Sequence, residues 1–353
     1  MKRPLLALII LLALSITLPQ LLRHQPTSDT ASESVTLSGR TMGTTYNITY
    51  IRNNSAEIKP ERVHQAVKTR LQEINQYMST YIGDSEISRI NKAPADTPVK
   101  ISPETAHVIA AAQQVSLATE GAFDITIGNL VNLWGFGPEV KLYAIPDETK
   151  IKDILAQSGY QRLKLDPAQL QVLKLTDSLY LDLSGIAKGY AVDEIAELLA
   201  QHGFPNHLVE IGGEIRTGGE KSPGNPWNIG IERPYTKEHS LQRIIHSSTS
   251  ISMATSGDYR NYFEHDGKRY SHTIDPKTGH PIKHNLAAIS VLHSSCMLAD
   301  AYATAFMVMG PARSIEFATE HDISVYMLVK EEHGFTARSS PAFEKNFSSV
   351  GRK

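Results

Sequence analysis

The sequence contains one cysteine, Cys296, in 353 residues. A disulfide framework within the chain therefore cannot form, and a zinc ribbon or an iron–sulfur cage lacks the thiolates it needs. Any metal must bind through oxygen or imidazole ligands, and the fold must be stabilised by packing. The composition allows this, because 41% of the residues are hydrophobic and 20% are charged, as in ordinary globular proteins.

The charge balance argues against a nucleic-acid-binding protein. The chain has 35 Lys and Arg against 37 Asp and Glu, for a formal net charge of -2. Nucleic-acid binders usually show a basic excess or a basic stripe.

The first 24 residues predict export. Lys2 and Arg3 precede an apolar run at residues 5–18, and polar residues follow. This order is typical of a signal peptide or an uncleaved membrane anchor. No cysteine follows the run, which excludes a lipoprotein anchor, and no convincing A-x-A cleavage site comes directly after it. We expect an uncleaved anchor with Lys2 and Arg3 inside, and a cleaved signal peptide is the alternative.

The remainder divides into a polar tether at residues 25–34 and one exported domain at residues 35–345. The tether is rich in Ser and Thr, as linkers often are. The region after about residue 315 matches no motif, and we expect residues 339–353 to form a loosely held tail.

Hydrophobic periodicity predicts a mixture of helices and strands. The expected helices cover residues 60–78, 102–119, 147–159, the stretch after Gly189 to about 201, and 295–309. Residues 35–51 are expected to form two strands joined by a turn at 41–44. Further strands are expected at 179–183, 207–211, 227–231 and 286–292. Because strands and helices do not strictly alternate, the pattern favours the α+β class over a doubly wound sheet.

Two glycine-rich segments are candidates for ligand contact. Residues 184–189 follow an expected strand and open a helix, where backbone N–H groups and Lys188 could bind phosphate. Residues 212–219 contain four glycines, which allow a ligand to approach the backbone closely. A plain strand–turn–helix and a tight hairpin remain the alternatives.

Asp300 and Thr304 are spaced to share one face of a helix. A carboxylate and a hydroxyl among alanines could hold a hard cation such as Mg²⁺. A solvated helix face is the alternative, but the apolar surroundings indicate that Asp300 needs a partner.

His272 precedes a turn in which Asp275 and Pro276 have type I turn chemistry, so Asp275 is interpreted as structural. His272 could act as a base or contact phosphate, or be a satisfied structural histidine. The aromatic residues at 132–137 could stack on a planar ring or form a buried corner.

Several segments together resemble the ApbE family, the FAD:protein FMN transferases. They run in family order from Gly39 to Gly310 and cover most of the predicted domain. The matching blocks are GRTMGT (39–44), MSTY (78–81), DSEISRIN (84–91), GAFD (121–124), LVNLWGFG (130–137), DLSGIAKGY (182–190), VEIGG (209–213), ATSGDYR (254–260), HTIDPKTG (272–279) and ADAYAT (299–304).

The resemblance implies an α+β, T-fold-like flavin transferase domain behind the N-terminal signal or anchor. It implies Mg²⁺-dependent transfer of FMN from FAD to a Thr or Ser hydroxyl of a partner protein, with release of AMP. The expected acceptors are subunits of membrane redox pumps of the sodium-translocating quinone reductase or Rnf type. The expected location is the periplasmic side of the inner membrane, and many exported members carry a lipobox cysteine that this chain lacks.

The resemblance also implies the site residues. Those expected to bind FAD are Met42, Tyr81, Ala122, Phe123, Asp124, Asp182, Lys188 and Ile274, the last through its backbone. Those expected to bind Mg²⁺ are Asp300, Thr304 and backbone oxygens near Gly185 and Ala303. The expected catalytic residues are Asp300 and His272, with His272 as the candidate base.

Two other functions remain open on the sequence. An FAD pyrophosphatase would use the same metal site and give free FMN and AMP. A non-enzymatic periplasmic flavin-binding protein would hold FAD without cleaving it.

Overall fold

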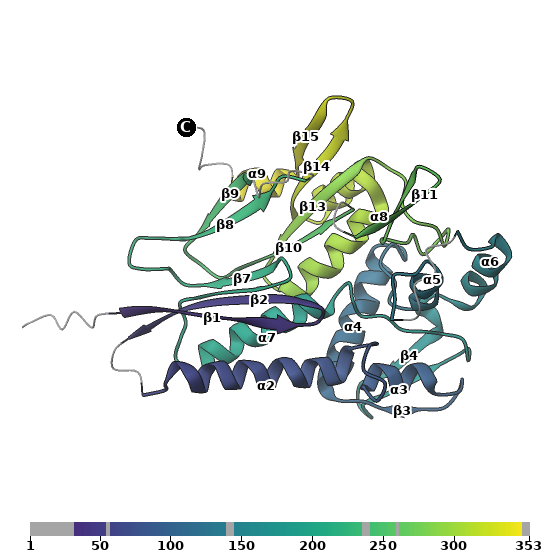
Figure 1. Ribbon diagram of the computed structural model, residues 1–353, viewed down its shortest axis with the longest axis horizontal. Helices are drawn as coiled ribbons and strands as arrows, with labels where there is room; N and C mark the ends of the chain where they lie inside the picture. Colours follow the sequence, from purple (N-terminus) through teal and green to yellow (C-terminus); the bar gives the residue numbers. More distant parts are fainter. Residues whose placement is uncertain (1–31, 54–56, 139–144, 235–240, 259–260, 348–353) are drawn as a thin grey trace, which may run out of the picture.

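The computed structural model describes residues 32–53, 57–138, 145–234, 241–258 and 261–347 (Figure 1). The helices are α2 (Pro60–Met78), α3 (Glu86–Lys92), α4 (Pro103–Ala118), α5 (Gly128–Leu133), α6 (Glu148–Gln157), α7 (Ala187–Gln201), α8 (Cys296–Glu320) and α9 (Pro341–Phe347), with a 3-10 turn η1 (Tyr160–Arg162). The strands are β1 (Ser32–Thr41), β2 (Thr44–Asn53), β3 (Val99–Lys100), β4 (Leu163–Asp166), β5 (Gln171–Lys174), β6 (His207–Ile211), β7 (Glu214–Gly218), β8 (Trp227–Glu232), β9 (Leu241–Ser247), β10 (Ile251–Gly257), β11 (Tyr262–His265), β12 (Lys268–Ser271), β13 (Leu286–His293), β14 (Ser324–Glu331) and β15 (Gly334–Ser339). The α+β prediction is confirmed.

The predicted anchor at residues 1–24 and most of the tether lie outside the described residues. Within the described part of the chain, no helix is both long and apolar enough to cross a membrane.

An eight-stranded sheet organises the molecule, in the order β1-β2-β6-β7-β10-β13-β14-β15, with antiparallel pairing throughout. Both faces of its centre are covered, so β13 is buried along nearly its whole length instead of alternating. Helices α7 and α8 pack on one face, and the β8–β9 hairpin and α9 cover the other (Figure 1).

Helices α2 and α4 follow from their sequence patterns. The predicted apolar stripe of α2 is buried and consists of Val63, Val67, Leu71, Ile74 and Met78. Helix α4 begins where predicted, because the Ser102 hydroxyl accepts the N–H of Thr105 and Pro103 occupies the first turn.

Helices α7 and α8 lie in close contact at Gly189. A Cβ added there would lie 2.2 Å from the Cys296 carbonyl oxygen and 2.8 Å from Asp300 Cβ. Only a glycine permits this approach, and it places the start of α7 against the first turns of α8. Helix α8 is broken at Gly310, whose φ of 75° interrupts the helical backbone where the sequence predicts an end. A second helical run, not predicted, then continues to Glu320.

Two predictions of secondary structure are wrong. Residues 179–183 form no strand, although Leu179, Leu181 and Leu183 are buried as an alternating strand would be. On one side, the Asn91 side chain donates to the Leu181 carbonyl oxygen and accepts the Leu181 N–H. On the other side, Tyr180 makes only an isolated bridge with Ile127.

The expected tail is also wrong in its described part. Helix α9 buries Phe343, which packs against Tyr326 of the main sheet. Residues 348–353 lie outside the described part.

The β6–β7 hairpin is shorter than its neighbours, and this leaves a notch in the sheet. Gly212 and Gly213 turn the chain where β6 ends. On one side β2 extends past the last pair with β6 to Thr44, and on the other β10 extends past its last pair with β7, at Met253. The notch therefore lies between the β1–β2 turn and the end of β10.

Candidate functional site

A cavity of about 1150 Å³ occupies this notch and continues down to α7 and α8. Segments far apart in the sequence line it, which explains why the sequence motifs are scattered. Every predicted site residue except Ala303 lines the cavity: Met42, Tyr81, Ala122, Phe123, Asp124, Asp182, Gly185, Lys188, His272, Ile274, Asp300 and Thr304. Ala303 is fully buried in α8, so only its backbone could contribute.

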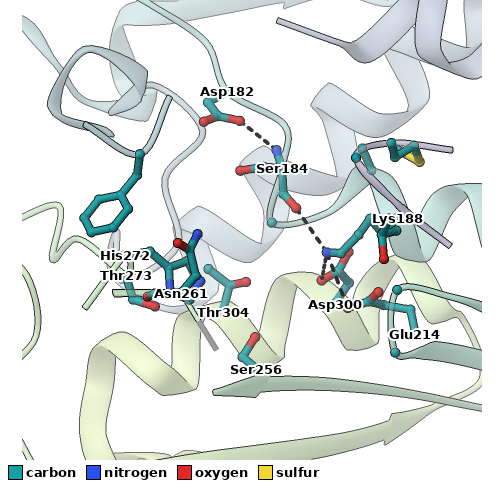
Figure 2. Close-up of a pocket in the computed structure, with 18 of the residues that line it drawn as sticks. Asp182, Ser184, Lys188, Glu214, Ser256, Asn261, His272, Thr273, Asp300 and Thr304 are labelled. Carbon is teal, nitrogen blue, oxygen red and sulfur yellow. Dashed lines mark hydrogen bonds and ion pairs between the residues drawn. The ribbon is translucent and has the colours of Figure 1, made fainter. Parts of the chain in front are cut away.

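Lys188 lies among acidic side chains in this cavity (Figure 2). Its Nζ lies 3.3 Å from Glu214 Oε1 and 3.7 Å from Asp300 Oδ1, and donates to the Ser184 carbonyl oxygen at 3.4 Å. Burial alone would lower the pKa of Lys188, but Asp300 and Glu214 outweigh it and raise that pKa above its usual value. The ammonium therefore stays charged, and it lies between the side chains of Glu214 and Asp300.

Glu214 is the main site residue that the sequence reasoning missed. Its side chain is 4% exposed, and its Oε2 has no hydrogen-bond partner among the described residues. Burial raises the pKa of Glu214 to about 8, with repulsion from Asp300 adding to the effect and Lys188 opposing it. Its position in the first residue of β7, directly after a glycine pair, is the only sequence signal that marked it.

Asp300 is positioned by the contact between the two helices. The N–H of Gly189 donates to Asp300 Oδ2 at 3.0 Å, while Oδ1 faces Lys188. The partner that the sequence required for a buried Asp300 is therefore Lys188.

Thr304 lies one turn further along α8, beside Gly185. A Cβ added to Gly185 would lie 3.1 Å from Thr304 Oγ1, so the loop backbone passes directly over this hydroxyl. Among the described residues, no group of three or more His, Cys, Asp or Glu side chains could hold a metal. A carboxylate, a hydroxyl and backbone carbonyls nevertheless form an oxygen-only donor set, which fits a hard cation such as Mg²⁺.

His272 is held in one tautomer. Its Nδ1 lies 3.0 Å from the Asn261 carbonyl oxygen, which can only accept, so Nδ1 carries the proton in the neutral ring. Burial lowers the pKa of His272, which favours that neutral form. The Nε2 atom is then an acceptor, as a general base requires.

Asp124 and Asp182 serve the local backbone. Asp124 accepts hydrogen bonds from the Thr126 N–H and hydroxyl and from the Tyr160 N–H, and burial raises its pKa. Asp182 accepts the Ser184 N–H at 2.8 Å and so shapes the loop that leads to Lys188. The carboxylate of Asp124 is therefore occupied by hydrogen bonds within the protein and holds the backbone of the cavity wall in place.

The aromatic segment divides into a structural and a cavity part. Trp134 is buried and donates from Nε1 to the Gly279 carbonyl oxygen, as in a buried aromatic corner. Phe136 lines the cavity and meets the His272 ring edge-on at 6.3 Å between centroids. Tyr81 also lines the cavity and is 71% exposed.

The notched antiparallel sheet and the lysine–carboxylate cluster below it define an α+β protein with a deep polar ligand cavity. Residues 42–327 match the sequence model of the ApbE family. The chain is 42% identical over 314 residues to the FAD:protein FMN transferase of Haemophilus influenzae, covering 88% of this chain and 91% of that protein. It is 44% identical over 313 residues to that of Vibrio cholerae, covering 89% and 92%.

Solved structures agree with this relationship. The flavin transferase ApbE from Vibrio cholerae matches with a TM-score of 0.82 at 43% identity, covering 89% of this chain and 99% of that chain. The apo flavinyl transferase ApbE of Pseudomonas stutzeri matches with a TM-score of 0.83 at 38% identity, covering 91% and 98%. The chain belongs to the ApbE family.

Proposed function

We propose that this protein is an Mg²⁺-dependent FAD:protein FMN transferase. It moves FMN from FAD onto a Thr or Ser hydroxyl of a partner protein and releases AMP. The observation that carries the proposal is the cluster of Lys188, Asp300 and Glu214 beside Thr304, inside a cavity large enough for a dinucleotide. The relatives named above carry this activity in their names.

The charge of the cavity supports a requirement for a cation. Among the described lining residues, Lys188 is the single lysine or arginine. The acidic lining residues are Asp124, Asp182, Glu210, Glu214, Glu232 and Asp300. Burial raises the pKa of Glu214 and Asp124 and so reduces their charge. The remaining carboxylates would still repel a pyrophosphate unless a metal ion added positive charge.

The reaction is a displacement at phosphorus. The acceptor hydroxyl oxygen forms a bond to the FMN phosphorus, and the bond from that phosphorus to the bridging oxygen breaks. The electron pair leaves on the AMP phosphate, so the leaving group needs little protonation. The hydroxyl proton goes to His272 Nε2, while Lys188 stabilises charge on the phosphate oxygens.

Asp300, Thr304 and backbone oxygens near Gly185 and Ala303 would hold the magnesium ion. When bound, it supplies charge neutralisation and orientation of the pyrophosphate. The remaining work belongs to the chain: Gly189 fixes Asp300 from α7, and the Asn261 carbonyl fixes the tautomer of His272.

The test is an intact-mass assay with FAD, Mg²⁺ and a protein domain that bears a candidate acceptor threonine. A mass gain of one FMN minus water on the acceptor, abolished by EDTA, is expected. Free FMN and AMP without that gain would instead support a pyrophosphatase, and intact FAD would support a flavin-binding protein.

The acceptor and the location are part of the proposal. We propose acceptors among subunits of membrane redox pumps of the sodium-translocating quinone reductase or Rnf type. We place the domain on the periplasmic side of the inner membrane, held by an N-terminal anchor. The sequence at residues 1–24 supports this placement, and fractionation of the full chain tests it.

A further inference from the structure

We propose that the acceptor protein docks by adding an extended segment to the open edge of β10, beside Asp300 and Thr304. The open edge is the side of residues 254–257 that faces the notch. The inference rests on the proposed transferase function and concerns how its second substrate is held.

The open edge arises from unequal strand lengths. Strand β10 pairs with β13 along Ser252–Gly257, but with β7 only at Ile251, Ser252 and Met253. Beyond Met253, no strand in the described part of the chain pairs with this side of β10. Unpaired strand edges offer a row of backbone donors and acceptors to another chain.

The backbone groups on this edge can be assigned. The Asp258 N–H donates to the Ala287 carbonyl oxygen, across the ladder with β13. Because backbone groups alternate between the two sides of a strand, the N–H and C=O groups of Thr255 and Gly257 point to the opposite side. Two residues of β10 therefore direct their backbone groups at the notch.

The cavity reaches this edge. Thr255, Ser256 and Gly257 are consecutive and all line the cavity, although successive side chains of a strand point to opposite faces. The cavity thus contacts the strand from its side. Figure 2 shows Ser256 beside Thr304, so a segment on this edge passes close to the predicted metal ligands.

The notch leaves room for a backbone. At its base, in the β6–β7 turn, Gly213 has nothing within 4 Å of the position that a Cβ would take. The gap replaces two strands, β6 and β7, which corresponds to three inter-strand spacings between β2 and β10, or about 14 Å. The cavity of about 1150 Å³ also exceeds the size of most single-ligand pockets, roughly 300–1,000 Å³.

An extended peptide is the occupant that matches this chemistry. A nucleotide does not present N–H and C=O groups at the repeat of a strand, whereas strand addition uses that repeat for affinity. A threonine within such a segment would have its hydroxyl held near the phosphorus that it attacks. Docking would then be independent of most acceptor side chains.

The first experiment changes the acceptor and leaves the enzyme intact. A short synthetic peptide is copied from around the threonine that the wild-type enzyme modifies, and single backbone N-methyl groups are placed along it. Methylation at alternate positions is expected to raise the KM for the peptide at least tenfold. Methylation at the positions between them, which serve as matched controls, is expected to leave it nearly unchanged.

The second experiment changes the enzyme and uses the whole acceptor domain. Gly257→Pro removes one N–H from the open edge. It keeps the hydrogen bonds between β10 and β13, because the Gly257 N–H points away from β13. The KM for the acceptor is expected to rise at least tenfold, while the Kd for FAD, measured by flavin fluorescence, stays within twofold.

The outcomes separate the two proposals. If the wild-type enzyme puts no FMN on any acceptor, the proposed function fails. If it does so, but N-methylation has no effect or an equal effect at every position, strand addition to β10 is wrong. An effect on the Kd for FAD instead of the KM for the acceptor would also overturn it and assign the edge to the nucleotide.

Discussion

Single side chains in this site are positioned by the backbone at least as much as by one another. Asp300 is fixed by a peptide N–H of α7, and His272 by a carbonyl oxygen of a neighbouring loop. The sequence marked both residues because each stands in a motif. It could not mark Glu214 as their neighbour, since the contact with Lys188 depends on how β7 meets α7.

The negative charge of Asp300 is expected to be essential for FMN transfer, while its hydrogen bond with the Gly189 N–H supports the fold. Asp300→Asn keeps an oxygen that can accept the Gly189 N–H but removes a negative charge from the predicted metal site. Transfer is expected to fall by at least about 100-fold, the scale for losing one preorganised electrostatic group. Initial rates of FMN transfer, with circular dichroism as the check on folding, measure this.

Asp153→Asn provides a matched control, because this exposed aspartate lies on α6 and does not line the cavity. A rate for Asp300→Asn within threefold of this control would contradict the role of the Asp300 charge.

The His272 base is expected to set the acid side of the pH–rate profile. A base must be neutral, and burial lowers the pKa of His272 below the usual 6.5. The rate should therefore be constant down to about pH 6.5. Below that pH, the logarithm of the rate should fall with a slope of one per pH unit. His272→Ala should lower the rate by about 100-fold or more and remove that slope. Near-normal transfer by His272→Ala, alongside a loss in Asp300→Asn, would show that another group takes the proton.

At the level of elements, periodic patterns predicted best. The apolar stripe of α2 and the capped start of α4 are local properties of the sequence, and both lie where expected. Residues 179–183 show the limit of such patterns. Their alternation correctly predicts which leucines are buried, but a strand also needs a neighbouring strand along its length. Here the Asn91 side chain lies on one side, and the other side has only an isolated bridge to Ile127.

Gly189 tests whether the contact between α7 and α8 holds the site together. Gly189→Ala places a methyl group 2.2 Å from the Cys296 carbonyl oxygen, so the helices must separate. We expect a loss of about 1–3 kcal/mol in the free energy of unfolding, as for other overpacked contacts. The rate of transfer should fall as well, because Lys188 and Asp300 move apart. Urea titration and transfer rates measure the two effects.

Gly83→Ala is the matched control for that substitution. The nearest atom to its added Cβ is the flexible Lys92 Nζ at 4.0 Å, and its backbone φ is not in the left-handed region. Equal stabilities of the two variants would show that the helices do not depend on a glycine at their contact.

For the whole molecule, the short β6–β7 hairpin has the largest consequence. It opens the sheet where α7 and α8 approach from below, and one cavity then collects segments from residue 42 to residue 308. The resemblance implied site residues from distant segments, but not the notch. The notch depends on where two hairpins end relative to one another, which no local pattern records.

Because distant segments share the cavity, ligand binding is expected to stabilise the whole domain, and to do so cooperatively with metal. The acidic lining should weaken FAD binding without Mg²⁺. With Mg²⁺ present and FAD at a hundredfold excess over its Kd, the stabilisation should reach about 2.7 kcal/mol, which corresponds to a rise in Tm of about 4 °C. FAD with EDTA should give less than half of that shift, and so should FAD with Mg²⁺ in the Asp300→Asn variant. Equal shifts with Mg²⁺ and with EDTA would mean that Lys188 alone balances the pyrophosphate, and the predicted metal site would then be wrong.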